Sequence, residues 1–203
     1  MTLVRLLPIL IHASAFAHTP HDVIYALAAP ESLDDSAPWV TMVYHSNFVS
    51  DDAGLTWDST GGETATFTPV GGGILSDGTI ILCSKSEVYS SLNGTDWDIT
   101  TPENPLNVCA VQGNEVVLGA TTGVYLGPAN GPFERILEKS IGFLKANNGW
   151  VAGITIDNEV IVSTDDGTWL TLPSPHERLS SVVPNPEGGE YTLYAGGDTG
   201  NVL

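Results

Sequence analysis

Short runs of hydrophobic and β-branched residues alternate with turn-forming residues along almost the whole chain. Val, Ile, Tyr, Thr and Trp dominate the runs, and Gly, Asn, Asp and Pro separate them. Within residues 105–137, for example, the runs read L-N-V-C-A-V, E-V-V-L-G-A, G-V-Y-L and, after a turn, F-E-R-I. Outside the N-terminus, no segment of ten or more residues has convincing helical periodicity. The pattern therefore predicts an all-β protein.

Four such runs form a unit that recurs along the chain. A turn frame of the type S-x-D-x-G marks each unit, and its copies begin at positions 50, 90, 127 and 163, which gives spacings of 40, 37 and 36 residues. Four strands in a unit of this length are typical of a β-propeller blade. The sequence predicts four-stranded antiparallel blades over about residues 23–60, 64–102, 105–137 and 140–173, and a partial fifth blade over residues 178–203.

The fifth unit reaches the region of its third strand when the sequence ends at Leu203. Propellers usually close a ring of about 4–8 blades, and an open ring leaves strand edges unpaired. We expect an incomplete ring that belongs to a longer protein. The alternative is a protein of four and a half blades that a partner completes, and a stop codon directly after Leu203 in the full transcript would favour it.

Residues 50–57 read S-D-D-A-G-L-T-W and contain the most complete frame. The Asp52 carboxylate can accept hydrogen bonds from backbone N–H groups of its own turn, and the Ser50 hydroxyl can add a second local bond. Gly54 can adopt the positive φ that closes a hairpin, and Trp57 covers the turn with a large apolar face. We interpret these four residues as a structural turn.

The other frames are less complete. The second frame has Leu92 in the position of the Asp, the third keeps only Gly131 and the aromatic Phe133, and the fourth is one residue shorter before its Trp. The residues to which we assign the structural role are Ser50, Asp52, Gly54, Trp57, Ser90, Gly94, Trp97, Ser163, Asp165, Gly167 and Trp169.

With these frames, residues 23–203 resemble the Asp-box (BNR) repeat propellers. That superfamily includes sialidases, sortilin-type receptor ectodomains, xyloglucan-cleaving glycosidases and photosystem II assembly factors. The resemblance implies that the boxes lie on the blade periphery and do not take part in catalysis. A sialidase would need three arginines and an F/Y-R-I-P motif, but Arg135 and Arg178 are the only arginines after Arg5 and the motif is missing. Sialidase activity is therefore not expected.

A glycoside hydrolase with paired carboxylates stays open as an alternative, since it needs two carboxyl groups about 5–10 Å apart in one cleft. The visible pairs have simpler interpretations: Asp51-Asp52 and Asp165-Asp166 belong to boxes, and residues 34–35 lie in a predicted loop. Other catalytic motifs and regular metal-ligand spacings are absent from the sequence. Histidines at positions 18 and 21 could bind copper if the N-terminus were cleaved, but we expect no cofactor and no metal.

The net charge of the chain excludes some classes of binding partner. The chain has six Lys plus Arg against 24 Asp plus Glu, a net charge of −18, which disfavours nucleic acid and anionic membranes as partners.

Residues 1–17 resemble a signal peptide, with one Arg, an apolar L-L-P-I-L-I core and an A-F-A end. Cys83 and Cys109 could form a disulfide or remain buried thiols, and Asn93 begins the sequon N-G-T. These features indicate secretion or the secretory lumen.

The expected function is recognition of a protein or a glycan by a propeller module without catalysis of its own. The alternative is part of a xyloglucanase-like glycoside hydrolase whose active site is completed by further blades. Because propeller loops usually carry function, we expect the site in residues 29–39, 59–65 or 174–178.

Overall fold

The computed structural model describes residues 24–28, 38–43, 46–59, 68–147, 150–163, 168–173, 178–185 and 192–197. Every regular element assigned within these ranges is a β-strand, which confirms the prediction of an all-β protein. No helix in the described part of the chain is long and apolar enough to cross a membrane. Residues 1–17, the predicted signal peptide, lie outside the described residues.

Each repeat forms a group of four consecutive antiparallel strands, which we call a blade. Blade 1 contains β1 (Ile24–Ala28), β2 (Trp39–Val43), β3 (Ser46–Ser50) and β4 (Asp58–Ser59). Blade 2 contains β5 (Gly71–Ile74), β6 (Ile80–Cys83), β7 (Val88–Ser91) and β8 (Asp98–Thr100). Blade 3 contains β9 (Leu106–Gln112), β10 (Glu115–Ala120), β11 (Gly123–Gly127) and β12 (Glu134–Leu137).

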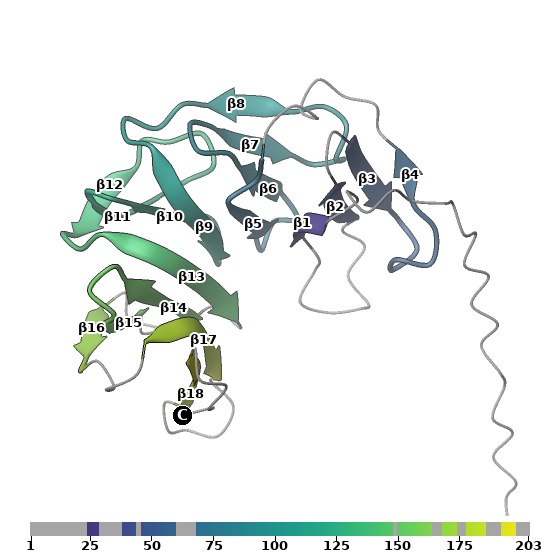
Figure 1. Cartoon of the computed structure of the whole chain (residues 1–203). Helices are drawn as coiled ribbons and strands as arrows, with labels where there is room; N and C mark the ends of the chain where they lie inside the picture. The colour runs from purple at the N-terminus through teal and green to yellow at the C-terminus, as the bar shows by residue number, and fades with distance from the viewer. Residues whose placement is uncertain are drawn as a thin grey trace, which may run out of the picture.

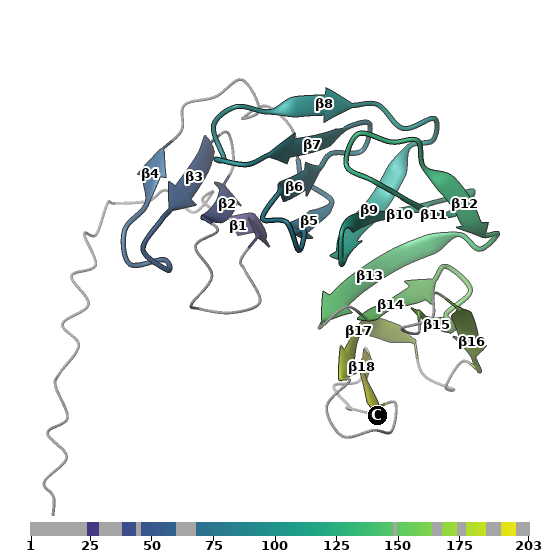
Figure 2. The same cartoon turned by 180° about the vertical axis from the view of Figure 1, so that it is seen from behind.

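Blade 4 contains β13 (Ile141–Asn147), β14 (Trp150–Thr155), β15 (Val160–Ser163) and β16 (Trp169–Leu172). A further antiparallel pair follows, β17 (Leu179–Asn185) and β18 (Thr192–Gly197). The blades follow one another along an arc, with the first strand of each blade toward the concave side and the fourth strand toward the outside (Figures 1 and 2). Neighbouring first strands also contact one another, as β9 contacts β13 and β13 contacts β17.

The first strand of blade 2 differs from its predicted position. The run T-F-T-P-V at residues 66–70 has the composition of a strand and predicts the first strand of this blade there, but β5 is the glycine-rich run Gly71–Ile74. Glycine is a poor strand former, yet here it allows a close approach of two backbones. A Cβ atom on Gly71 would lie 2.1 Å from the carbonyl oxygen of Cys109. Gly71 pairs with Cys109 in the parallel sense, and this contact joins blades 2 and 3 into one eight-stranded sheet.

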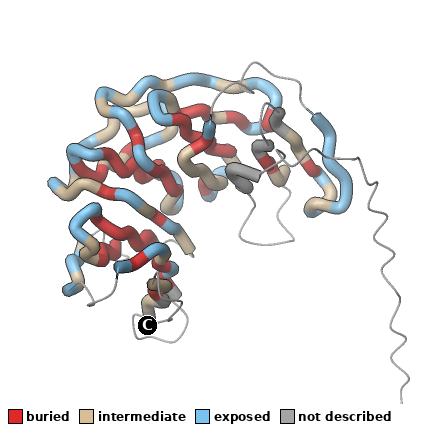
Figure 3. Tube along the Cα trace, viewed as in Figure 1, coloured by how far each residue is buried: buried red, intermediate tan, exposed pale blue. Residues whose placement is uncertain are grey.

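The hydrophobic core lies between the blades. Each of four clusters combines side chains from two neighbouring blades, or from blade 4 and the β17–β18 pair, and the middle strands of the blades supply most of the buried residues (Figure 3). All four residues of β6 and all four of β15 are buried. A middle strand has one neighbouring blade on each face, so both faces are apolar and its sequence is continuously hydrophobic. Each blade is therefore stabilised chiefly by the blades beside it.

Candidate binding site at the junction of blades 2 and 3

The turn of blade 1 has the hydrogen bonds expected of a complete box. The hydroxyl of Ser50 donates to Asp52 Oδ1 at 2.8 Å and accepts from the backbone N–H of Gly54 at 2.8 Å. Thr56 donates its N–H to Asp52 Oδ1 at 2.7 Å and its hydroxyl to Oδ2 at 2.6 Å. Trp57 Nε1 donates to the carbonyl of Gly54 at 3.1 Å.

These bonds act on the acidity of Asp52. The hydroxyl and then the amide of Thr56 stabilise the carboxylate form and lower the pKa of Asp52 from 3.8 to about 2. Both carboxylate oxygens accept hydrogen bonds within the turn, as expected for a residue that stabilises it.

In blade 2 the turn is held by residues one position further along than the repeat frame predicts. Ser91, rather than Ser90, accepts the N–H of Gly94 at 2.9 Å. Asn93, rather than Leu92, takes the part of the Asp, because its Oδ1 accepts the N–H groups of residues 95 and 96 at 2.9 Å each. Trp97 Nε1 donates to the carbonyl of Gly94 at 3.1 Å, as in blade 1. Asn93 therefore stabilises this turn by its side-chain oxygen, as Asp52 does in blade 1.

The box of blade 4 is described only in part. Ser163 is fully buried, and its hydroxyl accepts two hydrogen bonds: one from the backbone N–H of Val151 at 2.9 Å and one from Nε2 of Gln112 at 3.1 Å. Trp169 pairs with Ser163 across β15 and β16. Asp165 and Gly167 lie outside the described residues, so their predicted role stays a prediction.

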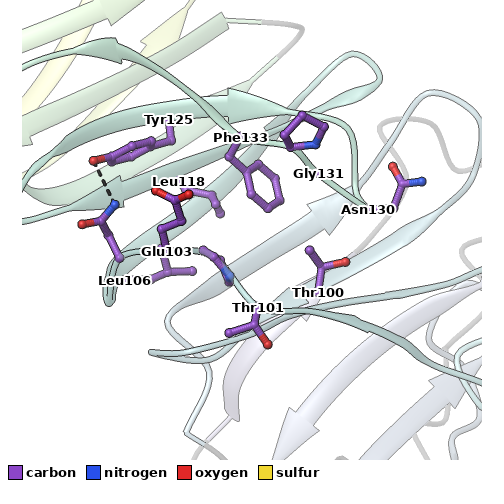
Figure 4. Close-up of a pocket in the computed structure, with 12 residues that line it drawn as sticks. Thr100, Thr101, Glu103, Leu106, Leu118, Tyr125, Asn130, Gly131 and Phe133 are labelled. Atoms are coloured by element: carbon purple, nitrogen blue, oxygen red, sulfur yellow. Dashed lines mark hydrogen bonds between the residues drawn. The ribbon is translucent and has the colours of Figure 1, made fainter.

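The turn of blade 3 retains the fewest box residues, and a pocket of about 260 Å³ lies beside it (Figure 4). Its walls come from the loop between β8 and β9, from the turn between β11 and β12, and from side chains of β10 and β11. The lining residues are Thr100, Thr101, Pro102, Glu103, Asn104, Leu106, Leu118, Tyr125, Asn130, Gly131, Pro132 and Phe133. The pocket therefore spans the boundary between two blades.

The floor of the pocket is apolar and its rim is polar. Leu106 and Leu118 are buried in the core cluster between blades 2 and 3, and Phe133 and Tyr125 pack against that cluster. The Tyr125 hydroxyl accepts a hydrogen bond from Asn104 Nδ2 at 3.1 Å, which holds the loop over β11. An apolar floor with a few placed polar groups is the usual composition of a ligand site.

The two cysteines form a disulfide, which was one of the two predicted alternatives, and are not free thiols. Cys83 in β6 and Cys109 in β9 are joined, with Cα atoms 6.3 Å apart, and both are buried in the same core cluster as the pocket floor. Asn93 of the sequon is exposed on the blade 2 turn, and its Nδ2 donates to Asp96 Oδ2 at 2.8 Å.

The three loops in which the sequence placed the function are almost entirely outside the described residues. Within residues 29–39, only Pro38 and Trp39 are described, and within residues 174–178 only Arg178. Sequence reasoning missed the pocket of blades 2 and 3. The available signals were the polar, proline-flanked loop T-P-E-N-P at residues 101–105 and the loss of the Asp-box residues in the third frame.

Comparison with known proteins shows the fold. No family model matches the chain, and no curated protein matches it. Solved structures do match, among them YCF48 bound to a D1 peptide (TM-score 0.62, 13% identity, 89% of this chain and 62% of that chain). Others are BBS1N in complex with ARL6DN (0.63, 13%, 89% and 64%) and streptogramin B lyase (0.63, 11%, 91% and 69%).

These structures are β-propellers, so the predicted fold class is confirmed: the chain is a β-propeller protein. The chain spans less than two thirds of the length of the YCF48 and BBS1N chains. At these identities the likeness shows the fold alone, and the Asp-box family remains a resemblance.

Proposed function

We propose that this chain is part of a propeller that recognises a protein or a glycan and has no catalytic activity of its own. The observation that carries the proposal is the pocket between blades 2 and 3, with its apolar floor and polar rim. Its volume of about 260 Å³ is slightly below the roughly 300–1,000 Å³ of pockets for drug-sized ligands. It suits one amino-acid side chain or one sugar ring.

The first strands support recognition over hydrolysis. They line the concave side of the arc, and a paired-carboxylate site would need two acidic side chains facing one cleft. In the part of the chain that the structure describes, none of β1, β5, β9, β13 and β17 contains an Asp or a Glu. A glycoside hydrolase would therefore have to take both carboxylates from loops or from further blades.

We place the protein outside the cytosol, in the secretory lumen or beyond the cell. The disulfide supports this compartment, because disulfides persist where the environment is oxidising. The N-terminal pattern and the exposed sequon residue Asn93 agree with it. Expression of the full chain in cultured eukaryotic cells tests the proposal. Export should depend on residues 1–17, and a glycosidase that removes N-glycans should lower the mass of wild type but not of a Thr95→Ala variant.

The binding function is tested with the full chain on arrays of glycans and of peptides. A Thr101→Trp variant is the matched comparison, since Thr101 is exposed at the rim and a Trp there would fill the entrance. Signals that wild type gives and the variant lacks would support the pocket as the site. Equal signals would contradict it, and turnover of a polysaccharide by wild type would favour the hydrolase alternative.

A further inference from the structure

We propose that the pocket between blades 2 and 3 binds the side chain of an Arg or Lys from a protein partner. This inference rests on the proposed recognition function and specifies its ligand. It comes from the charge of the lining and from the position of two aromatic rings.

Glu103 is the only charged residue among the twelve that line the pocket. Its side chain extends from the loop between β8 and β9 toward Leu118 and Tyr125 (Figure 4). The next basic residue after the β11–β12 turn, Arg135, forms an ion pair with Glu138. The pocket therefore presents one carboxylate to a ligand, and a cationic group is the natural partner of a carboxylate.

The aromatic rings favour the same ligand. Phe133 and Tyr125 come from blade 3 and lie on the other side of the pocket from Thr101 (Figure 4), and a cation within about 6 Å of a ring face is attracted to it. The stem of Arg or Lys is aliphatic, so it can lie on the partly exposed Pro102 and Phe133 while the charged head reaches Glu103. A sugar ring could use the aromatic wall, but it would gain less from the carboxylate.

The charge of the whole protein adds a long-range attraction for basic partners. A net charge of −18 attracts basic segments and repels acidic ones, so it accelerates encounter with a positively charged partner. This attraction is screened by salt and would act on any basic peptide. Selection of a single side chain must therefore come from the pocket itself.

The test uses the full chain and an array of eight-residue peptides with varied flanks and a central Arg, Lys, citrulline or norleucine. Citrulline has nearly the shape of Arg but no charge. We expect about tenfold tighter binding of the Arg and Lys peptides than of the citrulline and norleucine peptides, because hydrogen bonds to charged groups are the stronger ones. Glu103→Gln should remove this preference. Glu115 begins β10 and does not line the pocket, so Glu115→Gln removes an equal charge elsewhere and should retain the preference for Arg and Lys peptides.

The outcomes separate this inference from the function on which it rests. Equal binding of Arg and citrulline peptides, lost in Thr101→Trp, would overturn the cation inference and leave recognition by the pocket in place. Glycans that bind at the pocket while no peptide does would also overturn the inference. No difference between wild type and Thr101→Trp on either array would overturn both. A preference that survives in Glu103→Gln would assign the selectivity to the general acidity of the protein and contradict the inference.

Discussion

Cys83 and Cys109 are both register partners of the same residue, Gly71, and a disulfide joins them. Cys83 faces Gly71 within blade 2, and Cys109 faces it from the first strand of blade 3. Both sulfur-bearing side chains are buried in the cluster that lies under the pocket. The covalent link thus fixes the one place where two blades share a sheet among the described residues, and the floor of the proposed site depends on it.

Reduction of this disulfide should destabilise the protein. The cysteines are 26 residues apart, and closing a loop of that length contributes about 3–4 kcal/mol in the chain-entropy treatment of cross-links. Urea unfolding followed by Trp fluorescence, with and without a thiol reductant, measures the difference. A Cys83→Ala/Cys109→Ala double variant is the control and should not respond to the reductant. Unchanged stability of reduced wild type would contradict the prediction.

Substitution of Gly71 should open the junction between the blades. A methyl group there would lie 2.1 Å from the Cys109 carbonyl oxygen, so Gly71→Ala must displace backbone and should cost roughly 1–3 kcal/mol or more. Gly142→Ala in β13 is the matched control, because its only near atom is a carbonyl oxygen at 3.9 Å. Thermal unfolding of both variants checks the prediction. Equal melting temperatures would show that the β5–β9 contact does not constrain residue 71.

Much of this architecture could be predicted from the sequence, because blades are local structures. Strands such as β10 and β14 are continuous apolar runs between turn residues, and the repeat of the turn frame indicates the period of the fold. The position of β5 could not be predicted in this way. Its sequence is G-G-G-I, and glycine there is explained only by the closeness of the Cys109 backbone, which is distant in sequence.

The pocket could not be predicted from the sequence for a related reason. Leu106 and Leu118 are ordinary core positions, and Glu103 is an ordinary exposed loop residue, until the β11–β12 turn is placed beside them. The register of the blade 2 box was also ambiguous, since Ser90 and Ser91 are adjacent and either could begin the frame. Only the hydrogen bonds of the folded turn distinguish them.

The assignment of Asn93 to the Asp position of blade 2 gives a direct test. Asn93→Ala removes the acceptor of two backbone N–H groups and should cost about 1–2 kcal/mol, as the loss of a helix cap does. Leu92 has 71% of its surface exposed, so Leu92→Ala should change stability by less than about 0.5 kcal/mol. Urea unfolding of glycan-free protein makes the comparison. A larger loss in Leu92→Ala would favour the frame that begins at Ser90.

The Asp52 turn should respond to acid in a defined window. Because the pKa of Asp52 is about 2 in the folded protein, against 3.8 for an unperturbed Asp in an unfolded chain, its contribution to stability is complete above about pH 5. That contribution is lost as the pH falls toward 2, where the folded carboxylate takes up its proton. Asp52→Asn has no such proton to bind, so the stability difference between wild type and this variant should shrink over that interval.

Unfolding monitored by tryptophan fluorescence at several values between pH 5 and 2 follows this difference, since Trp57 donates to the same turn. Thr56→Val removes the hydroxyl that contributes most to the lowered pKa, so the pH dependence of its stability should move to higher pH. Asp51→Asn removes an equal charge from the neighbouring position and controls for the acidity of the chain as a whole. If Asp51→Asn reproduces the pH dependence of Asp52→Asn, the effect belongs to net charge and not to the hydrogen bonds of the turn.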